Sequence, residues 1–138
     1  MTVRHVQDPA ALRLLLQSPK GGIAKDLFRR GKKVEGRAKL NLERTPRRID
    51  TGTLRSSIHT TLFTVNGQPA VQVGTNLEYA IYVHEGTGIY GPKGMPIYPT
   101  TAKMLSWIPK KGKRVFARFV RGMRPNPFLK DAVTAAKD

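Results

Sequence analysis

The apolar residues between positions 23 and 44 recur at intervals that place them on one side of a helix. They are spaced three or four residues apart, close to the 3.6-residue turn of an α-helix: Ile23, Leu27, Gly31, Val34, Ala38 and Leu42. We therefore predict a long helix over residues 23–44 that buries this side, with Gly31 permitting close packing. It ends before Pro46, because the residue that precedes a proline avoids the helical conformation.

The most apolar and aromatic stretch of the chain spans residues 75–88. Thr75 or Asn76 can cap the start of a helix, because a side-chain oxygen there accepts a free backbone N–H. The glycines at the end of the stretch stop that helix, since glycine adopts positive φ at little steric cost. The alternative is a strand that continues residues 71–73 through a bulge or turn at Gly74. We prefer the short helix.

The other segments predict short strands, turns and two further helices. The pair Asn66-Gly67 is typical of a two-residue β-hairpin turn. A turn at Asp50, Thr51 and Gly52 is expected to direct Leu54 into the core and Arg55 outward. The predicted elements are a helix over residues 10–17 that begins at Asp8-Pro9, strands at 57–65, 70–73, 104–108 and 114–120, a short extended segment at 97–98, and a last helix from Asn126-Pro127 to residue 137.

This order of elements predicts an α+β fold, with a small, mostly antiparallel sheet packed against the long N-terminal helix and short helices in the middle and at the C-terminus. A length of 138 residues suits one domain, in which residues 1–19 form a short N-terminal helix or extension and residues 20–138 form the core. The residues expected to be mostly buried are Leu27, Val34, Ala38, Leu54, Ile58, Val71, Val73, Tyr79, Tyr82, Trp107 and Phe128.

Charge is distributed unevenly along this basic chain, whose formal net charge is +16. Residues 1–50 hold 13 basic and 5 acidic residues, residues 51–100 hold 2 of each, and residues 101–138 hold 10 and 2. The neutral middle is typical of a core, and the basic ends indicate surfaces that meet nucleic acid or acidic protein. We expect no disulfide, because the chain has no cysteine, and no membrane segment or signal peptide.

No set of residues predicts catalysis, a metal site or a cofactor. The histidines His5, His59 and His84 are scattered, and His84-Glu85 lacks the second histidine of a zinc-protease motif. The 9 acidic residues include no obvious acid–base pair. We therefore expect a protein without enzymatic activity. The alternative is a basic nucleic-acid-binding module or a small ribonuclease that uses His59 or His84.

Three segments of the chain form an ordered set of motifs. Residues 50–58 hold a Thr-Gly-x-Leu-Arg-x-Ser-Ile element, residues 73–87 a Tyr-Ala-x-Tyr-Val element that ends in Glu-Gly-Thr, and residues 124–129 a closing Pro-Phe-Leu. In this order they resemble the tail-completion or head–tail joining proteins of long-tailed phages, and the resemblance covers about residues 20–138. The pair His84-Glu85 stands where many members have Glu followed by an aromatic residue.

The resemblance implies a structural virion protein that forms a ring in the phage neck, assembled in the host cytoplasm. Its implied partners are copies of itself, the head connector or stopper protein, the tail tube or tail terminator protein, and non-specifically the packaged DNA; no membrane is implied. The residues expected to face these partners lie in two basic regions, namely Arg29, Arg30, Lys33 and Arg37 on the long helix, and Lys110, Lys111, Lys113, Arg118, Arg121 and Arg124 near the C-terminus.

Overall fold

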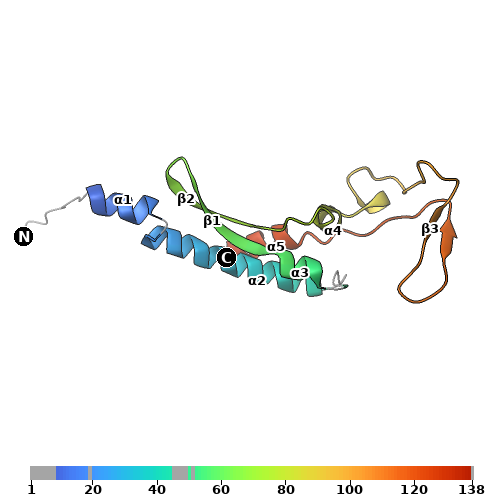
Figure 1. Ribbon diagram of the computed structural model, residues 1–138, viewed down its shortest axis with the longest axis horizontal. Coiled ribbons are helices and arrows are strands. Elements are labelled where there is room, and N and C mark those ends of the chain that lie inside the picture. The colour runs from blue at the N-terminus through green and yellow to red at the C-terminus, as the bar shows by residue number, and fades with distance from the viewer. Residues whose placement is uncertain (1–8, 19, 45–49, 51, 138) are drawn as a thin grey trace, which may run out of the picture.

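The molecule is elongated, with a helical end, a central body and a β-hairpin at the far end (Figure 1). The computed structural model describes residues 9–18, 20–44, 50 and 52–137. The predictions made for His5, Asp8, Thr45-Pro46 and Thr51 lie outside these residues. The elements are α1 (Pro9–Gln17), α2 (Gly22–Glu43), α3 (Thr53–Ser57), β1 (His59–Val65), β2 (Gln68–Gly74), α4 (Ala80–Glu85), a 3-10 turn η1 (Gly88–Tyr90), β3 (Leu105–Trp107), β4 (Val115–Ala117) and α5 (Phe128–Ala136).

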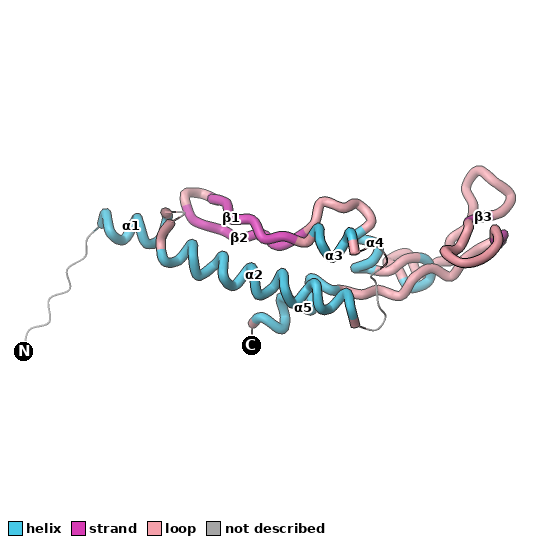
Figure 2. Tube along the Cα trace, turned by 60° about the horizontal axis from the view of Figure 1, so that its bottom comes forward, coloured by secondary structure: helices cyan, strands magenta, loops and turns pink. Residues whose placement is uncertain are grey.

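The long helix α2 packs against the β1–β2 hairpin, which runs along it in both views (Figures 1 and 2). Its buried residues follow the predicted side: Ala24, Gly31, Glu35, Ala38, Asn41 and Leu42. Leu27 and Val34 are half-buried. Gly31 has the predicted role, because a Cβ there would lie 2.5 Å from Val71 Cγ1 and 2.6 Å from Thr60 Cγ2. The absence of a side chain at Gly31 lets the strands approach the helix.

The β1–β2 hairpin has the turn that its sequence predicts. Val65 pairs with Gln68, so Asn66 and Gly67 form a two-residue loop. Their φ angles of 51° and 76° are both positive, as a type I′ turn requires. The second strand begins at Gln68, two residues earlier than expected. Val71 and Val73 are half-buried.

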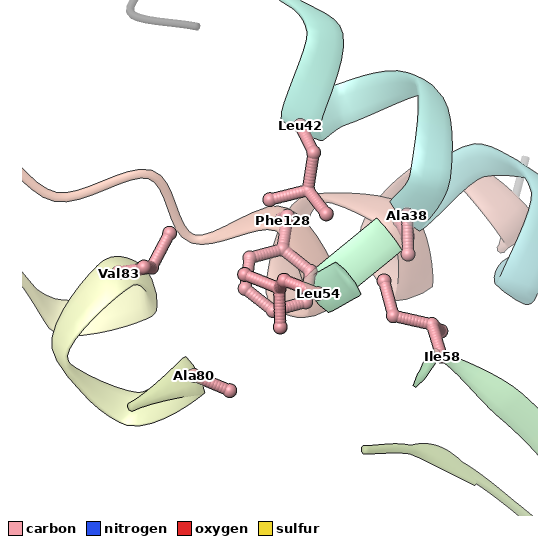
Figure 3. Packing of buried hydrophobic residues seen from close by; sticks show 8 residues of the cluster. Ala38, Leu42, Leu54, Ile58, Ala80, Val83 and Phe128 are labelled. Atoms are coloured by element: carbon pink, nitrogen blue, oxygen red, sulfur yellow. The ribbon is translucent and has the colours of Figure 1, made fainter. Parts of the chain in front are cut away.

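The core lies where α2, α3, α4 and α5 meet (Figure 3). Phe128 is fully buried near Leu42 and Leu54, and Val83 contributes from α4 (Figure 3). Two buried amides fix α5 on α2: Asn41 Nδ2 donates to the Phe128 carbonyl at 3.1 Å, and Asn126 Nδ2 donates to the Asn41 carbonyl at 3.1 Å. The predicted burial of Ala38, Leu54, Ile58 and Phe128 is confirmed.

Two helices differ from the sequence prediction. The connector before the first strand contains α3, whose start at Gly52 has a φ of 82°, and it buries Leu54 while Arg55 pairs outside with Glu43. The helix expected from Thr75 or Asn76 begins only at Ala80. Thr75 Oγ1 instead accepts the Leu77 N–H at 3.2 Å and contacts the Ser57 hydroxyl at 2.6 Å, so the threonine caps a turn that precedes the helix.

The second pair of strands forms a separate two-stranded sheet, and does not extend the β1–β2 hairpin. β3 and β4 are shorter than predicted, and the predicted extended segment at Ile97 pairs with Val120 in an isolated bridge. We call residues 97–120, from this bridge outward, the arm. It projects at the end of the molecule opposite α1 (Figure 1).

Three predicted core residues are exposed, namely Tyr79, Tyr82 and Trp107. Tyr82 is 58% exposed on α4 and Trp107 is 42% exposed in the arm. The prediction was wrong because aromatic side chains were assumed to be covered by their own chain. In this fold the arm projects beyond the body (Figure 1), and the described chain leaves all three side chains exposed.

Candidate interaction surfaces

The first basic region lies on α2, and part of its charge is balanced within the helix. Arg29 Nη2 lies 2.5 Å from Asp26 Oδ1, and Arg30 Nε lies 2.8 Å from Asp26 Oδ2. The hydrogen bond from Arg29 outweighs partial burial and, with the charge of Arg30, lowers the pKa of Asp26 below 3.8. Both arginines are exposed, as predicted, but one carboxylate offsets part of their charge.

Lys33 and Arg37 lie on a different part of the same helix, beside α5. They help to line a hollow of about 450 Å³, together with Gly36 and Leu40 of α2 and small alanines of α5. Neither residue has an ion pair within the part of the chain that the structure describes. Of the four basic residues predicted on this helix, these two therefore carry the least compensated charge.

Glu35 is the buried acid that attaches α2 to the hairpin. Its Oε1 accepts from Lys39 Nζ at 2.8 Å, and its Oε2 accepts from Lys32 Nζ at 2.9 Å and from Thr60 Oγ1 at 2.7 Å. Burial alone would raise the pKa of Glu35, but these hydrogen bonds outweigh it and lower the pKa to about 2. Sequence reasoning overlooked this residue, although lysines three residues before it and four after it are favourably spaced for ion pairs on a helix.

The second basic region is spread over the arm and its base. Lys110, Lys111, Lys113 and Arg118 are all exposed, and Lys110 forms an ion pair with Asp50. Arg121 and Arg124 lie below the arm, where the Arg121 carbonyl accepts the Ile89 N–H at 2.8 Å. The Arg124 guanidinium lies 5.4 Å from the centre of the Tyr90 ring. The arm lies at one end of the molecule, and α1 and the start of α2 lie at the other end (Figure 1).

The base of the arm is a close crossing of two backbone segments. The Thr87 N–H donates to the Met123 carbonyl, and the Met123 N–H donates to Thr87 Oγ1, both at 2.9 Å. A Cβ on Gly88 would overlap the Arg121 carbonyl, and one on Gly122 would overlap the Thr87 carbonyl. Both glycines have positive φ. The Gly-Thr-Gly motif that follows α4 therefore also holds residues 121–123, where the chain returns from the arm to the body.

An apolar hollow of about 500 Å³ lies between α4 and the base of the arm. Its lining includes Ile81 and Tyr82 from α4 and Met95 and Ile97 from the following loop, all of them exposed. Its charged lining residues are one acid, Glu85, and one base, Lys93. Sequence reasoning assigned Tyr82 to the core and so missed this surface. We call it the α4 hollow.

The comparisons with known proteins bear on the body rather than on the arm. Residues 22–86 match the model of the HK97-gp10-like family, described as “Bacteriophage HK97-gp10, putative tail-component”. The match covers a little less than half of the chain. It confirms the predicted resemblance to a phage protein family over this segment, and the family is described as a tail component. No curated protein and no solved structure matches the chain.

The matched segment includes α2, both strands of the first hairpin and α4, and it ends at Gly86, the first glycine of the Gly-Thr-Gly motif. Of the three elements that carried the resemblance, the first lies inside it, the second lies inside it up to Gly86, and the closing Pro-Phe-Leu lies beyond it. The family match does not support the alternative of a nucleic-acid-binding module or ribonuclease.

The described histidines have structural neighbours. His84 packs edge-on against Phe128 with ring centres 5.4 Å apart, and its Nε2 accepts the Lys130 N–H at 3.4 Å. His59 Nδ1 lies 2.9 Å from the Ser57 carbonyl. Across residues 9–18, 20–44, 50 and 52–137, no three acidic or histidine side chains gather as metal ligands, and no helix is long and apolar enough to span a bilayer. The absence of enzymatic activity stays a prediction.

Proposed function

We propose that the protein is a structural subunit of the phage neck, where copies form a closed ring that joins the DNA-filled head to the tail. The observation that carries this proposal is the family match over residues 22–86, together with the order of the three motifs. The ring contacts the head connector or stopper protein on one side and the tail tube or tail terminator protein on the other. It assembles in the host cytoplasm and acts without catalysis or a cofactor.

The charge of the surface fits such a subunit. Identical subunits in a ring use heterologous contacts, in which one face meets a different face of the next copy. Lys33 and Arg37 on α2, and Lys111 and Lys113 on the arm, are exposed and all of one sign. Surfaces of like charge repel, so at least one of them faces acidic protein or the DNA that passes through the ring. The free protein is then monomeric or weakly associated until it meets its partners.

A charge-reversal experiment tests this proposal. Replacing Arg29, Arg30 and Lys33 together by glutamate is a poor test. The new acids at positions 29 and 30 would lie three and four residues after Asp26, and like charges at these spacings repel and weaken a helix. The double variant Lys33→Glu/Arg37→Glu avoids this, since both residues are exposed and have no ion pair within the described residues. We expect an intact fold by circular dichroism and a loss of head–tail joining of at least tenfold, counted by electron microscopy in a complementation assay.

The matched control is Lys20→Glu/Lys25→Glu, which removes the same charge from exposed sites near the start of α2. It should support near-normal joining. If the folded Lys33→Glu/Arg37→Glu variant produces normal numbers of joined particles, this face has no role in the neck. If particles join equally well without the protein, the neck assignment itself is wrong.

A further inference from the structure

We propose that the arm of one subunit docks into the α4 hollow of the next copy, with Ile108 and Phe116 as the inserted side chains. This inference rests on the proposed ring and names the contact that would close it. The arm and the hollow are different surfaces, so their pairing is a heterologous contact of the kind that generates rings.

The arm exposes apolar side chains on both faces of a two-stranded ribbon. Trp107 pairs with Val115 and Ser106 with Phe116, and successive residues of a strand point to opposite faces. Trp107 and Phe116 therefore project to opposite sides, and they are 42% and 60% exposed. An isolated two-stranded ribbon has little stability in water. The arm needs another surface to cover it, and the described chain supplies none.

The α4 hollow has the size and the lining to receive such side chains. Its volume of about 500 Å³ lies within the range of about 300–1,000 Å³ that is usual for sites binding small molecules. Ile81, Tyr82, Met95 and Ile97 make its wall mostly apolar. Burying an aromatic side chain there removes apolar area of both partners from water, which is the main driving force for association.

Charge favours the α4 hollow over the exposed leucines of α1. Glu85 and Lys93 both line the hollow, and Glu78 lies just before α4, so two acids stand near it against one lysine; neither carboxylate has an ion pair within the described residues. These acids complement the basic side chains of the arm, namely Lys111, Lys113 and Arg118. The exposed leucines of α1 instead have Arg13 and Lys20 as neighbours in the sequence, which repel a basic arm.

The arm does not fill the hollow of its own chain. It leaves the body from Ile97, at the wall of that hollow, and projects away from α4 in both views (Figures 1 and 2). Its tip is held by the exposed ion pair between Lys110 and Asp50, and an ion pair this exposed stabilises little because water and salt screen it. A second copy can therefore receive the arm at little cost.

Cross-linking between copies tests the contact, and the absence of native cysteine makes each introduced thiol unique. Ile108→Cys places a thiol on the arm and Met95→Cys places one in the hollow. The control Leu14→Cys lies on α1 and matches Met95 in exposure, 64% against 61%. Singly substituted proteins carrying different tags are mixed at high concentration and treated with a short bis-maleimide, so every mixed product joins two copies.

We expect the arm–hollow mixture to give at least fivefold more mixed dimer than the arm–α1 mixture. The doubly substituted chain Ile108→Cys/Met95→Cys should give a ladder of oligomers that ends at a closed species, both in solution and in particles. Glu85→Lys should reduce the yield several-fold, and Lys113→Glu in the partner should restore part of it. Equal yields with the hollow and with α1, or an arm that cross-links to another virion protein, would overturn the inference.

The two proposals fail differently in this design. If heads and tails join only when the protein is present, but the arm–hollow product is absent in solution and in particles, the neck function stands and the inference is wrong. If the product forms while joining does not depend on the protein, the contact stands and the neck function is wrong.

Discussion

Large apolar side chains are buried in the body but exposed in the arm. In the body, Phe128 and Leu42 are fully buried among residues from four helices (Figure 3). In the arm, Trp107 and Phe116 are exposed on a ribbon of two short strands. The family match ends at residue 86, so the arm at residues 97–120 lies wholly outside it. The comparison teaches that one part of this chain completes its own core, whereas the other leaves apolar area for a partner.

The two regions also differ in what holds them in place. The body combines apolar packing with buried polar contacts, such as the acceptor Glu35 between α2 and β1 and the donor Asn41 between α2 and α5. The arm is anchored at its base by backbone hydrogen bonds of the glycine crossing, and at its tip by one exposed ion pair. The direction of the arm is therefore fixed near the body, while the surface of its outer part is left uncovered.

The largest expected effect comes from a pair of aromatic truncations. Phe128→Ala removes a fully buried ring and leaves a cavity, which should lower the free energy of unfolding by about 3–5 kcal/mol. Trp107→Ala should change it by less than about 1 kcal/mol, because the indole is already partly in water. Urea unfolding of the free protein measures both. A similar loss for the two variants would mean that the arm belongs to the core of the free subunit.

Local features of the body were predictable from sequence, because each depends on a few neighbouring residues. The buried side of α2 follows the spacing of its apolar residues, and the Asn66-Gly67 turn follows from their tolerance of positive φ. Gly31 was recognised because it interrupts an apolar helix face where a larger residue is expected. The shortest helix, α3, was missed, since its five residues are too few to show a period.

The surface of α4 and the arm was not predictable in the same way. The sequence shows that Tyr79, Tyr82 and Trp107 are large aromatic residues, but not what covers them. Their exposure depends on how far α4 and the arm extend beyond α2, a distance set by contacts remote in the sequence. The charge pattern located both basic regions, but only the coordinates show that Asp26 balances Arg29 and Arg30.

A pH titration should distinguish the body from the arm, because Glu35, whose pKa is strongly lowered, lies in the body. Its pKa is about 2 when folded, against an ordinary value of 4.5, so the folded state favours the charged form. This contribution to stability is present above about pH 5 and is lost as the pH falls toward 2. Its full size is on the order of 2–3 kcal/mol, allowing for the partly exposed Lys32.

The measurement is the unfolding free energy of the wild type and of Glu35→Gln between pH 7 and pH 2. The difference between the two proteins should shrink steadily as the pH falls below 5, because glutamine does not titrate. The arm should respond little, since it contains no acidic residue. A constant difference across this range would show that Glu35 does not stabilise the contact between α2 and the hairpin as a charged acceptor.

The last comparison concerns substitutions at two glycines of α2. Changing each glycine to valine separates the effect of close packing on the unfolding free energy from the effect of helix propensity. Gly31→Val places methyl groups against Val71 and Thr60, whose branched side chains cannot easily move aside, so the hairpin must shift. We expect a loss of about 1–3 kcal/mol in unfolding free energy. Gly36→Val makes the same chemical change five residues later on the same helix, where an added Cβ meets nothing within 4 Å.

Valine and glycine have helix propensities that differ by only a few tenths of a kcal/mol, so Gly36→Val should be nearly neutral. The difference between the two variants therefore isolates the contact between α2 and the hairpin. Arm–hollow cross-linking measured on the same variants completes the comparison. A folded Gly31→Val protein that loses stability but keeps the cross-link would show that the arm acts independently of how tightly the hairpin packs on α2. Equal stability of the two variants would mean that the hairpin does not approach α2 as closely as Gly31 requires.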